Sequence, residues 1–255
     1  MTGPGEAFPA PVQTTPPAAP RGWDVLVAGL AFAVLVVLLV GLGYLANLPG
    51  SSIMASLDAK LLLTVALLIA QNLAILAGVG LALWRRGAGA ALLGLTGANW
   101  RRVILGFLAG IGIALGLGLA RYGLQQVFDF SSQTPGAEML APAGFTWLGF
   151  ALMLLVAGLF APFCEEVLFR GLLFGWLRQH MRPWLAALVS ALPFGLLHIE
   201  PQHVVYATAA GFLLALVYQR SGSLWSSVAA HMAINLLAVS EVYIALAMGV
   251  PLDQI

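Results

Sequence analysis

Three short motifs in the second half of the chain combine ionisable and amide side chains that could activate a water molecule. A carboxylate with a nearby imidazole can hold and deprotonate water, while a second imidazole and an amide can stabilise the oxyanion of a tetrahedral intermediate. This chemistry is hydrolysis without a Ser or Cys nucleophile. The motifs are P-F-C-E-E-V-L-F-R, with Glu165, Glu166 and Arg170; F-G-L-L-H, with Phe194 and His198; and H-M-A-I-N, with His231 and Asn235.

Helical spacing separates the roles of the two adjacent glutamates. Glu166 and Arg170 are four residues apart and share a helix face, so they can form an ion pair. Glu165 lies about 100° round the helix from Glu166 and is the carboxylate left for other chemistry. The same four-residue spacing places His231 and Asn235 on one face, from which both present polar groups in one direction.

The composition indicates a membrane protein. Hydrophobic residues make up 61% of the 255-residue chain and charged residues only 8%, against roughly 25% charged residues in a soluble domain. Lys and Arg number 11 and Asp and Glu number 10, so there is no basic surface for a nucleic acid and we predict no such partner. The single cysteine, Cys164, excludes an intramolecular disulfide and a zinc site of several cysteines.

We predict an all-α, polytopic transmembrane bundle of about seven spans. An apolar stretch of about 20 residues crosses a hydrocarbon core of about 30 Å. The stretch at 145–177 is too long for one straight crossing, and Pro162 can kink it. The candidate spans are 25–46, 61–84, 103–120, 145–177, 184–200, 203–219 and 224–248.

The chain divides into a Pro-rich tail at 1–22, N-terminal transmembrane helices at 23–125 and a helical core at 145–248 that contains the three motifs. The tail buries too little apolar surface to fold and is predicted to be disordered. Cytoplasmic loops collect arginine, which predicts a cytoplasmic N-terminus. One lysine against ten arginines suggests a bacterial protein, and therefore the bacterial inner membrane. The arginines on the predicted cytoplasmic side are Arg21, Arg85, Arg86, Arg101, Arg102, Arg178, Arg182 and Arg220.

The polar motifs lie at similar depths. At about 1.5 Å per residue, Glu165, His198 and His231 lie roughly 20, 24 and 16 Å from the arginines at the cytoplasmic ends of their helices. A charged side chain at the bilayer centre costs about 2.5–3.5 kcal/mol. We therefore expect one water-filled pocket inside the bundle to accommodate all of them.

The three motifs resemble those of the CAAX-protease and bacteriocin-processing family of intramembrane endopeptidases, which includes the type II CAAX prenyl endopeptidase and the bacterial abortive-infection proteins. The family pattern is E-E-x-x-x-R, F-x-x-x-H and H-x-x-x-N/D, in order on separate transmembrane helices, and all three parts are intact here. The similarity covers residues 145–248, which the resemblance identifies as the catalytic core.

The resemblance implies a glutamate-type protease. The position of Glu165 would activate water together with that of His198, and the positions of His231 and Asn235 would form the oxyanion site. Glu166, Arg170 and Phe194 would support them. We predict an intramembrane endopeptidase that acts without a cofactor on a peptide or membrane-protein substrate in the lipid bilayer; the sequence gives no prediction of oligomeric state.

Three other functions are compatible with parts of the pattern. Glu165, His198 and His231 could bind zinc, but the chain has no H-E-x-x-H motif, which favours a metal-free mechanism. A non-catalytic immunity or scaffold protein would not need the intact set of polar residues. A proton-coupled transporter is disfavoured because no internal inverted repeat is evident.

Two further features lie outside the motifs. Glu200 and His203 are at the turn between two predicted spans and are interpreted as loop residues, with a gate or substrate-entry role as the alternative. The third span has small-x-x-x-small spacing, which favours close helix packing. Its glycines are Gly106, Gly110, Gly112, Gly116 and Gly118.

Overall fold

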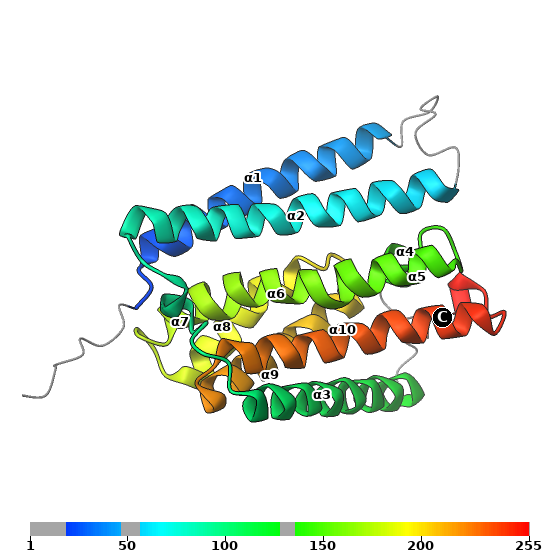
Figure 1. Cartoon of the computed structure of the whole chain (residues 1–255). Helices are drawn as coiled ribbons and strands as arrows, with labels where there is room; N and C mark the ends of the chain where they lie inside the picture. The colour runs from blue at the N-terminus through cyan, green and yellow to red at the C-terminus, as the bar shows by residue number, and fades with distance from the viewer. Residues whose placement is uncertain (1–18, 47–56, 128–135, 255) are drawn as a thin grey trace, which may run out of the picture.

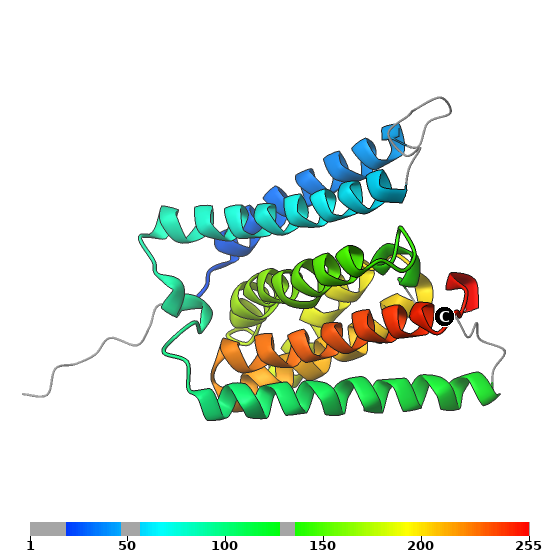
Figure 2. The same ribbon diagram turned by 45° about the vertical axis from the view of Figure 1, so that its right-hand side comes forward.

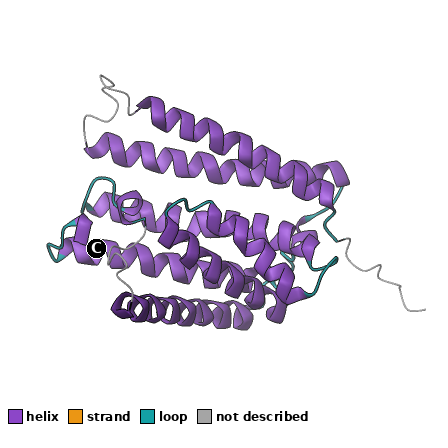
Figure 3. Cartoon of the chain, turned by 180° about the vertical axis from the view of Figure 1, so that it is seen from behind, coloured by secondary structure: helices purple, strands orange, loops and turns teal. Residues whose placement is uncertain are grey.

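The computed structural model describes residues 19–46, 57–127 and 136–254, and its regular elements are helices (Figures 1 and 3). Most of the predicted disordered tail, residues 1–18, lies outside the described residues. The carbonyl group of Pro20 accepts a hydrogen bond from the Gln179 amide at 3.0 Å, and that of Ala19 accepts one from Arg86 at 2.8 Å. The end of the predicted tail is therefore in contact with the bundle.

Five helical stretches are long and apolar enough to cross a membrane, and two shorter apolar helices, Gly22–Leu38 and Pro183–Leu196, accompany them in the described parts of the chain. This confirms an all-α, multi-pass integral membrane protein with about seven membrane segments. The helices are α1 (Gly22–Ala46), α2 (Leu57–Arg86), α3 (Trp100–Val127), a continuous helix Trp147–Leu177, α8 (Pro183–Leu196), α9 (Pro201–Ser221) and α10 (Leu224–Ala247).

The helix Trp147–Leu177 alternates between two hydrogen-bonding patterns. It consists of α5 (Trp147–Met153), a π-helical segment Leu154–Phe160, α6 (Ala161–Glu166), a second π-helical segment Val167–Phe174 and α7 (Gly175–Leu177). It continues through Pro162, between the two wider segments. The short helices are Ala90–Leu93, α4 (Ala137–Leu140) and Leu252–Gln254.

The bundle has two unequal parts. Helices α1 and α2 pack mainly against each other as a hairpin, and α8 pairs with α9 in the same way. Figure 2 shows the α1–α2 hairpin on one side of the Trp147–Leu177 helix and α3 on the opposite side, alongside α10. Helix α2 is the hairpin member that makes most contacts with the Trp147–Leu177 helix, so it forms a wall facing the motif-bearing core.

Helix α3 approaches α10 closely at two of its glycines. A Cβ on Gly106 or Gly110 would collide with the backbone of Ser226 or Ala230, whereas a Cβ on Gly112 would meet open space. The predicted small-residue packing is therefore confirmed at Gly106 and Gly110. It is wrong for the three glycines with no neighbour within contact distance, Gly112, Gly116 and Gly118, because that side of α3 faces away from α10.

The arginine-rich ends of the helices lie together. Helix α1 begins, α2 ends, α3 begins, α9 ends and α10 begins at the same end of the bundle (Figure 1). The predicted cytoplasmic arginines are at or next to these ends in the sequence. This arrangement is the one that the predicted topology requires.

The predicted span 184–200 is wrong at its C-terminal end, because α8 stops at Leu196. Its 14 residues span about 21 Å, which is less than a hydrocarbon core of about 30 Å. Pro201 occupies the first turn of α9, and a residue before proline is held in an extended conformation, as Glu200 is (φ −64°, ψ 126°). His198 therefore lies in a turn and not on a transmembrane helix.

Candidate active site

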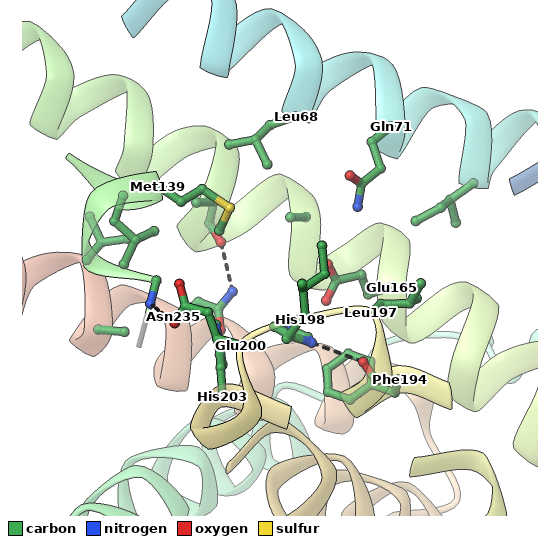
Figure 4. Close-up of a pocket in the computed structure, with 18 of the residues that line it drawn as sticks. Leu68, Gln71, Met139, Glu165, Phe194, Leu197, His198, Glu200, His203 and Asn235 are labelled. Carbon is green, nitrogen blue, oxygen red and sulfur yellow. Dashed lines mark hydrogen bonds between the residues drawn. The ribbon is translucent and has the colours of Figure 1, made fainter. Parts of the chain in front are cut away.

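A pocket of about 300 Å³ lies where α2, α4, the Trp147–Leu177 helix, the α8–α9 turn and α10 meet (Figure 4). Three of the four predicted catalytic residues, Glu165, His198 and Asn235, line it together although they are far apart in the sequence, and the predicted supporting residue Phe194 lines it as well. The rest of the lining is mostly apolar. The polar lining residues are Gln71, Glu165, His198, Glu200, His203 and Asn235.

Glu166 is completely buried beside the pocket, where it forms the predicted ion pair. Its Oε1 lies 2.7 Å from Nη1 of Arg170, and both side chains have at most 1% of their surface exposed. Nη2 of Arg170 donates a hydrogen bond to the carbonyl oxygen of Gly211 at 3.0 Å. The guanidinium group also lies 4.4 Å from the ring centroid of Phe194, within the range of a cation–π contact. The second motif thus contacts the first through Phe194.

The other contacts of Glu166 come from α10. The Ser227 hydroxyl group donates to Oε2 of Glu166 and also lies near the carbonyl oxygen of Leu214, while Nδ1 of His231 lies 2.9 Å from Oε1 of Glu166. Ser227 was not among the predicted site residues. Its signal in the sequence is the four-residue spacing Ser227, His231, Asn235, which places the three on one helix face.

His231 lies between the two glutamates. Its Nε2 is 3.7 Å from Oε2 of Glu165, which is beyond a direct hydrogen bond. The His231 side chain is 5% exposed and that of Glu165 is 17% exposed; only Glu165 lines the pocket. The predicted common direction of His231 and Asn235 is therefore realised in part, because Asn235 reaches the pocket surface and His231 does not.

Asn235 is fixed by one hydrogen bond. Its Nδ2 donates to the carbonyl oxygen of Ala157 at 2.9 Å, across the interface between α10 and the Trp147–Leu177 helix. A side-chain amide has two N–H groups and one carbonyl oxygen. One N–H group is engaged with Ala157, which leaves the second N–H group for a ligand in the pocket.

His198 is oriented by its own turn. Its Nδ1 lies 3.0 Å from the carbonyl oxygen of Phe194. Because a carbonyl oxygen can only accept, Nδ1 carries the hydrogen, and Nε2 of the neutral ring is an acceptor. The ring also contacts the rings of Phe194 and His203, with centroid distances of 5.2 and 4.4 Å. In Figure 4 the side chains of His198 and Glu165 lie on the same side of the pocket.

The turn that holds His198 contains an uncommon backbone conformation. Ile199 has a φ of 63°, a region that β-branched residues avoid. Across it, the N–H group of Glu200 donates to the carbonyl oxygen of His198 at 2.7 Å. The Glu200 carboxylate accepts a hydrogen bond from the N–H group of Gly136 at 3.0 Å, which connects the turn to the start of α4.

The interpretation of Glu200 and His203 as loop residues is wrong for His203 and incomplete for Glu200. His203 is in the first turn of α9, because that helix begins at Pro201, two residues before the predicted span. Both side chains line the pocket. Gln71 was also missed; the available signal was an amide side chain inside the predicted span 61–84.

No group of three His, Cys, Asp or Glu side chains has the geometry to hold a metal ion within residues 19–46, 57–127 and 136–254. The alternative ligand set Glu165, His198 and His231 falls within that range. Nδ1 of His231 faces Glu166 and Nδ1 of His198 faces a carbonyl oxygen.

Residues 147–237 match the model of a protein family described as "Type II CAAX prenyl endopeptidase Rce1-like". A curated Bacillus subtilis (strain 168) protein, named "Putative membrane peptidase YdiL", is 34% identical over 88 residues, which are 34% of this chain and 36% of that relative. The chain thus spans about a third of the curated relative that it matches. No solved structure matches the chain significantly. All three motifs, from Glu165 to Asn235, fall within the matched residues, and over this segment the chain is similar to the type II CAAX prenyl endopeptidase family.

Proposed function

We propose that this protein is an intramembrane endopeptidase in which Glu165 and His198 activate the water that hydrolyses a peptide bond. One observation carries the proposal: Glu165, His198 and Asn235 line a single pocket whose remaining lining is mostly apolar. Polar side chains inside a membrane bundle cost free energy unless water or a polar substrate reaches them. The family match and the similarity to a protein named as a membrane peptidase support the same conclusion.

The separation of the two glutamates supports the role of Glu165 as the base. Glu166 is occupied by Arg170, Ser227 and His231, whereas the pocket-lining carboxylate of Glu165 makes no direct hydrogen bond to any residue that the structure describes. In the proposed reaction Glu165 takes one proton from water while the water oxygen attacks the peptide carbonyl carbon. The same proton then passes to the leaving amine as the C–N bond breaks.

The other pocket residues orient the water and stabilise charge. The Nε2 acceptor of His198 can take a hydrogen bond from the second O–H group of the water, which directs a lone pair of its oxygen at the carbonyl carbon. The free N–H group of Asn235 donates to the oxyanion that develops on the carbonyl oxygen. His231 does not line the pocket and would act on this site through Glu165, whose Oε2 lies 3.7 Å from its Nε2.

The test uses the purified protein in lipid nanodiscs with fluorescence-quenched casein, an unfolded polypeptide that presents many sequences. A peptide ending in a farnesylated Cys-aliphatic-aliphatic-X sequence is assayed beside it, because the matched family model is named for a CAAX prenyl endopeptidase. Glu165→Gln and His198→Ala should each abolish cleavage of whichever probe the wild type cuts. Glu241→Gln makes the same chemical change at an exposed glutamate of α10 and should retain wild-type activity.

Either of two results would refute the proposal. The first is full activity of the Glu165→Gln variant with unchanged thermal unfolding, which would remove Glu165 from the chemistry. The second is the absence of cleavage by wild-type protein of both probes and of a diverse library of apolar peptides.

The same proposal includes the cellular setting. We place the protein in the bacterial inner membrane with the arginine-rich helix ends on the cytoplasmic side, because short cytoplasmic loops collect Arg and Lys. The helical core at 145–248 would be catalytic, and peptides or membrane proteins within the bilayer would be its substrates. Cysteine labelling at the two ends of the bundle would test the orientation.

A further inference from the structure

Among the polar residues that line the pocket, Gln71 belongs to no motif and lies outside the residues matched by the family model. Gln71 is on α2, in the N-terminal hairpin, and lines the pocket with Leu68 and Ile75 of the same helix. These three positions, spaced by three and four residues, form one helix face. In Figure 4 the amide group of Gln71 is directed from the α2 wall toward the side of the pocket that holds Glu165.

The neighbouring residue Asn72 shows how a buried amide side chain on α2 can form a hydrogen bond within the helix itself. Asn72 is 1% exposed, and its Nδ2 donates to the carbonyl oxygen of Leu68, one turn back on the same helix, at 2.8 Å. Gln71 makes no hydrogen bond of this kind to any described residue. Leaving an amide group without a partner in an apolar setting costs free energy, on the order of 1–3 kcal/mol per group. The position of Gln71 is consistent with a partner that arrives from the pocket.

An extended peptide provides the matching chemistry. It brings unpaired backbone N–H and C=O groups into the bundle, and both must find partners away from water. A glutamine amide offers one acceptor and two donors and can therefore bind either group or both. On the opposite wall, the amide of Asn235 and Nδ1 of His198 already bond to backbone carbonyl groups of the protein.

We propose that Gln71 binds the main chain of the substrate and so holds the scissile peptide bond against Glu165. This inference rests on the proposed endopeptidase function and assigns a substrate-binding role to the α1–α2 hairpin. Gln71 is a substrate-positioning residue that takes no part in proton transfer. Its interaction is made with the bound substrate before and during the reaction, so its loss should weaken binding more than turnover.

The experiment measures KM and kcat separately for cleavage of quenched casein, and then of a synthetic peptide that covers a casein site cut by the wild type. Gln71→Leu should raise KM about 3- to 10-fold, the effect of one lost hydrogen bond, with kcat within about twofold of wild type. Gln202→Leu is the matched control, since Gln202 is half-buried on α9 but does not line the pocket. Its KM and kcat should equal those of the wild type.

A backbone substitution in the substrate identifies the contact. Replacing one peptide N–H group near the scissile bond by an ester oxygen removes a donor without changing side chains. If Gln71 accepts from that group, the ester raises KM for the wild type and adds nothing further in Gln71→Leu. Gln71→Met, with an unbranched side chain, repeats the measurement if the leucine variant unfolds.

An unchanged KM in Gln71→Leu and Gln71→Met, with cleavage by the wild type intact, would overturn this inference alone. If every ester raises KM by the same factor in the wild type and in the Gln71 variants, Gln71 does not contact the main chain of the substrate, and the inference is again overturned. If the wild type cuts neither casein nor the other probes, the proposed function fails first, and this inference fails with it.

Discussion

His231 Nδ1 lies 2.9 Å from Oε1 of Glu166, so a buried carboxylate fixes the ring between the two glutamates. The same oxygen is paired with Arg170 at 2.7 Å. A carboxylate in this position fixes the tautomer and the direction of an imidazole. Glu166 therefore orients His231, whereas Glu165 lines the pocket itself.

The buried ion pair gives the first prediction. Arg170→Met leaves Glu166 without its cationic partner, and removal of one partner of a buried ion pair costs about 3–5 kcal/mol of unfolding free energy. The double variant Glu166→Gln/Arg170→Met should recover part of that loss because no isolated charge remains. Unfolding by SDS titration in mixed micelles measures the stability of the wild type, the two single variants and the double variant. Additive losses in the double variant would contradict a direct pairing.

Asn235 should affect turnover more than stability. Asn235→Ala removes the free N–H group proposed for the oxyanion, and kcat should fall about 10²- to 10³-fold. Its bond to Ala157 contributes about 1 kcal/mol to stability. The control is Asn72→Ala, at a buried asparagine with one comparable bond that does not line the pocket; this variant should keep its kcat. A wild-type kcat in Asn235→Ala would show that Asn235 only packs and does not stabilise the oxyanion.

A displacement of α10 at its contact with α3 should also move the site residues, because Ala230 directly precedes His231. Gly110→Ala forces α10 away from α3, and overpacking of this kind costs about 1–3 kcal/mol and should reduce cleavage. Gly112→Ala makes the same change on the same helix, facing open space. It should stabilise the helix by up to about 1 kcal/mol. Equal effects of the two substitutions on unfolding would show that the close approach is unimportant.

The left-handed backbone conformation of Ile199 leads us to expect opposite outcomes for two substitutions. The side chain is 80% exposed, so Ile199→Gly loses little packing. It relieves about 1–2 kcal/mol of backbone strain, partly offset by about 0.5–1 kcal/mol of chain entropy, and activity and thermal stability should be retained. Proline cannot adopt a φ of 63°, so Ile199→Pro should displace His198 and abolish cleavage. Cleavage by the proline variant at the wild-type rate would show that the turn does not position His198.

A metal-free mechanism predicts activity that resists chelators. Cleavage should persist after dialysis against EDTA or 1,10-phenanthroline, assayed beside a zinc protease that verifies chelation. Loss of activity with recovery on addition of zinc would instead favour Glu165, His198 and His231 as ligands.

The sequence was sufficient for the helices and for the Glu166–Arg170 pair, because both follow from hydropathy and from the four-residue period of one helix. It was insufficient wherever position depends on contacts between segments. The end of α8 depends on the residues of the turn before Pro201. A hydropathy average over many residues does not detect such a turn. Gln71 could not be assigned to the pocket, because the packing of the α1–α2 hairpin on the core has no local signature in the chain.

The shortness of α8 has a consequence for the lipid around it. A 14-residue helix leaves a hydrophobic mismatch of about 9 Å against an average bilayer. The lipids beside it must thin, or water must descend to the α8–α9 turn. Either response brings the aqueous phase nearer to His198, so bilayers of short-chain lipids should favour hydration of the pocket, and thick bilayers should oppose it.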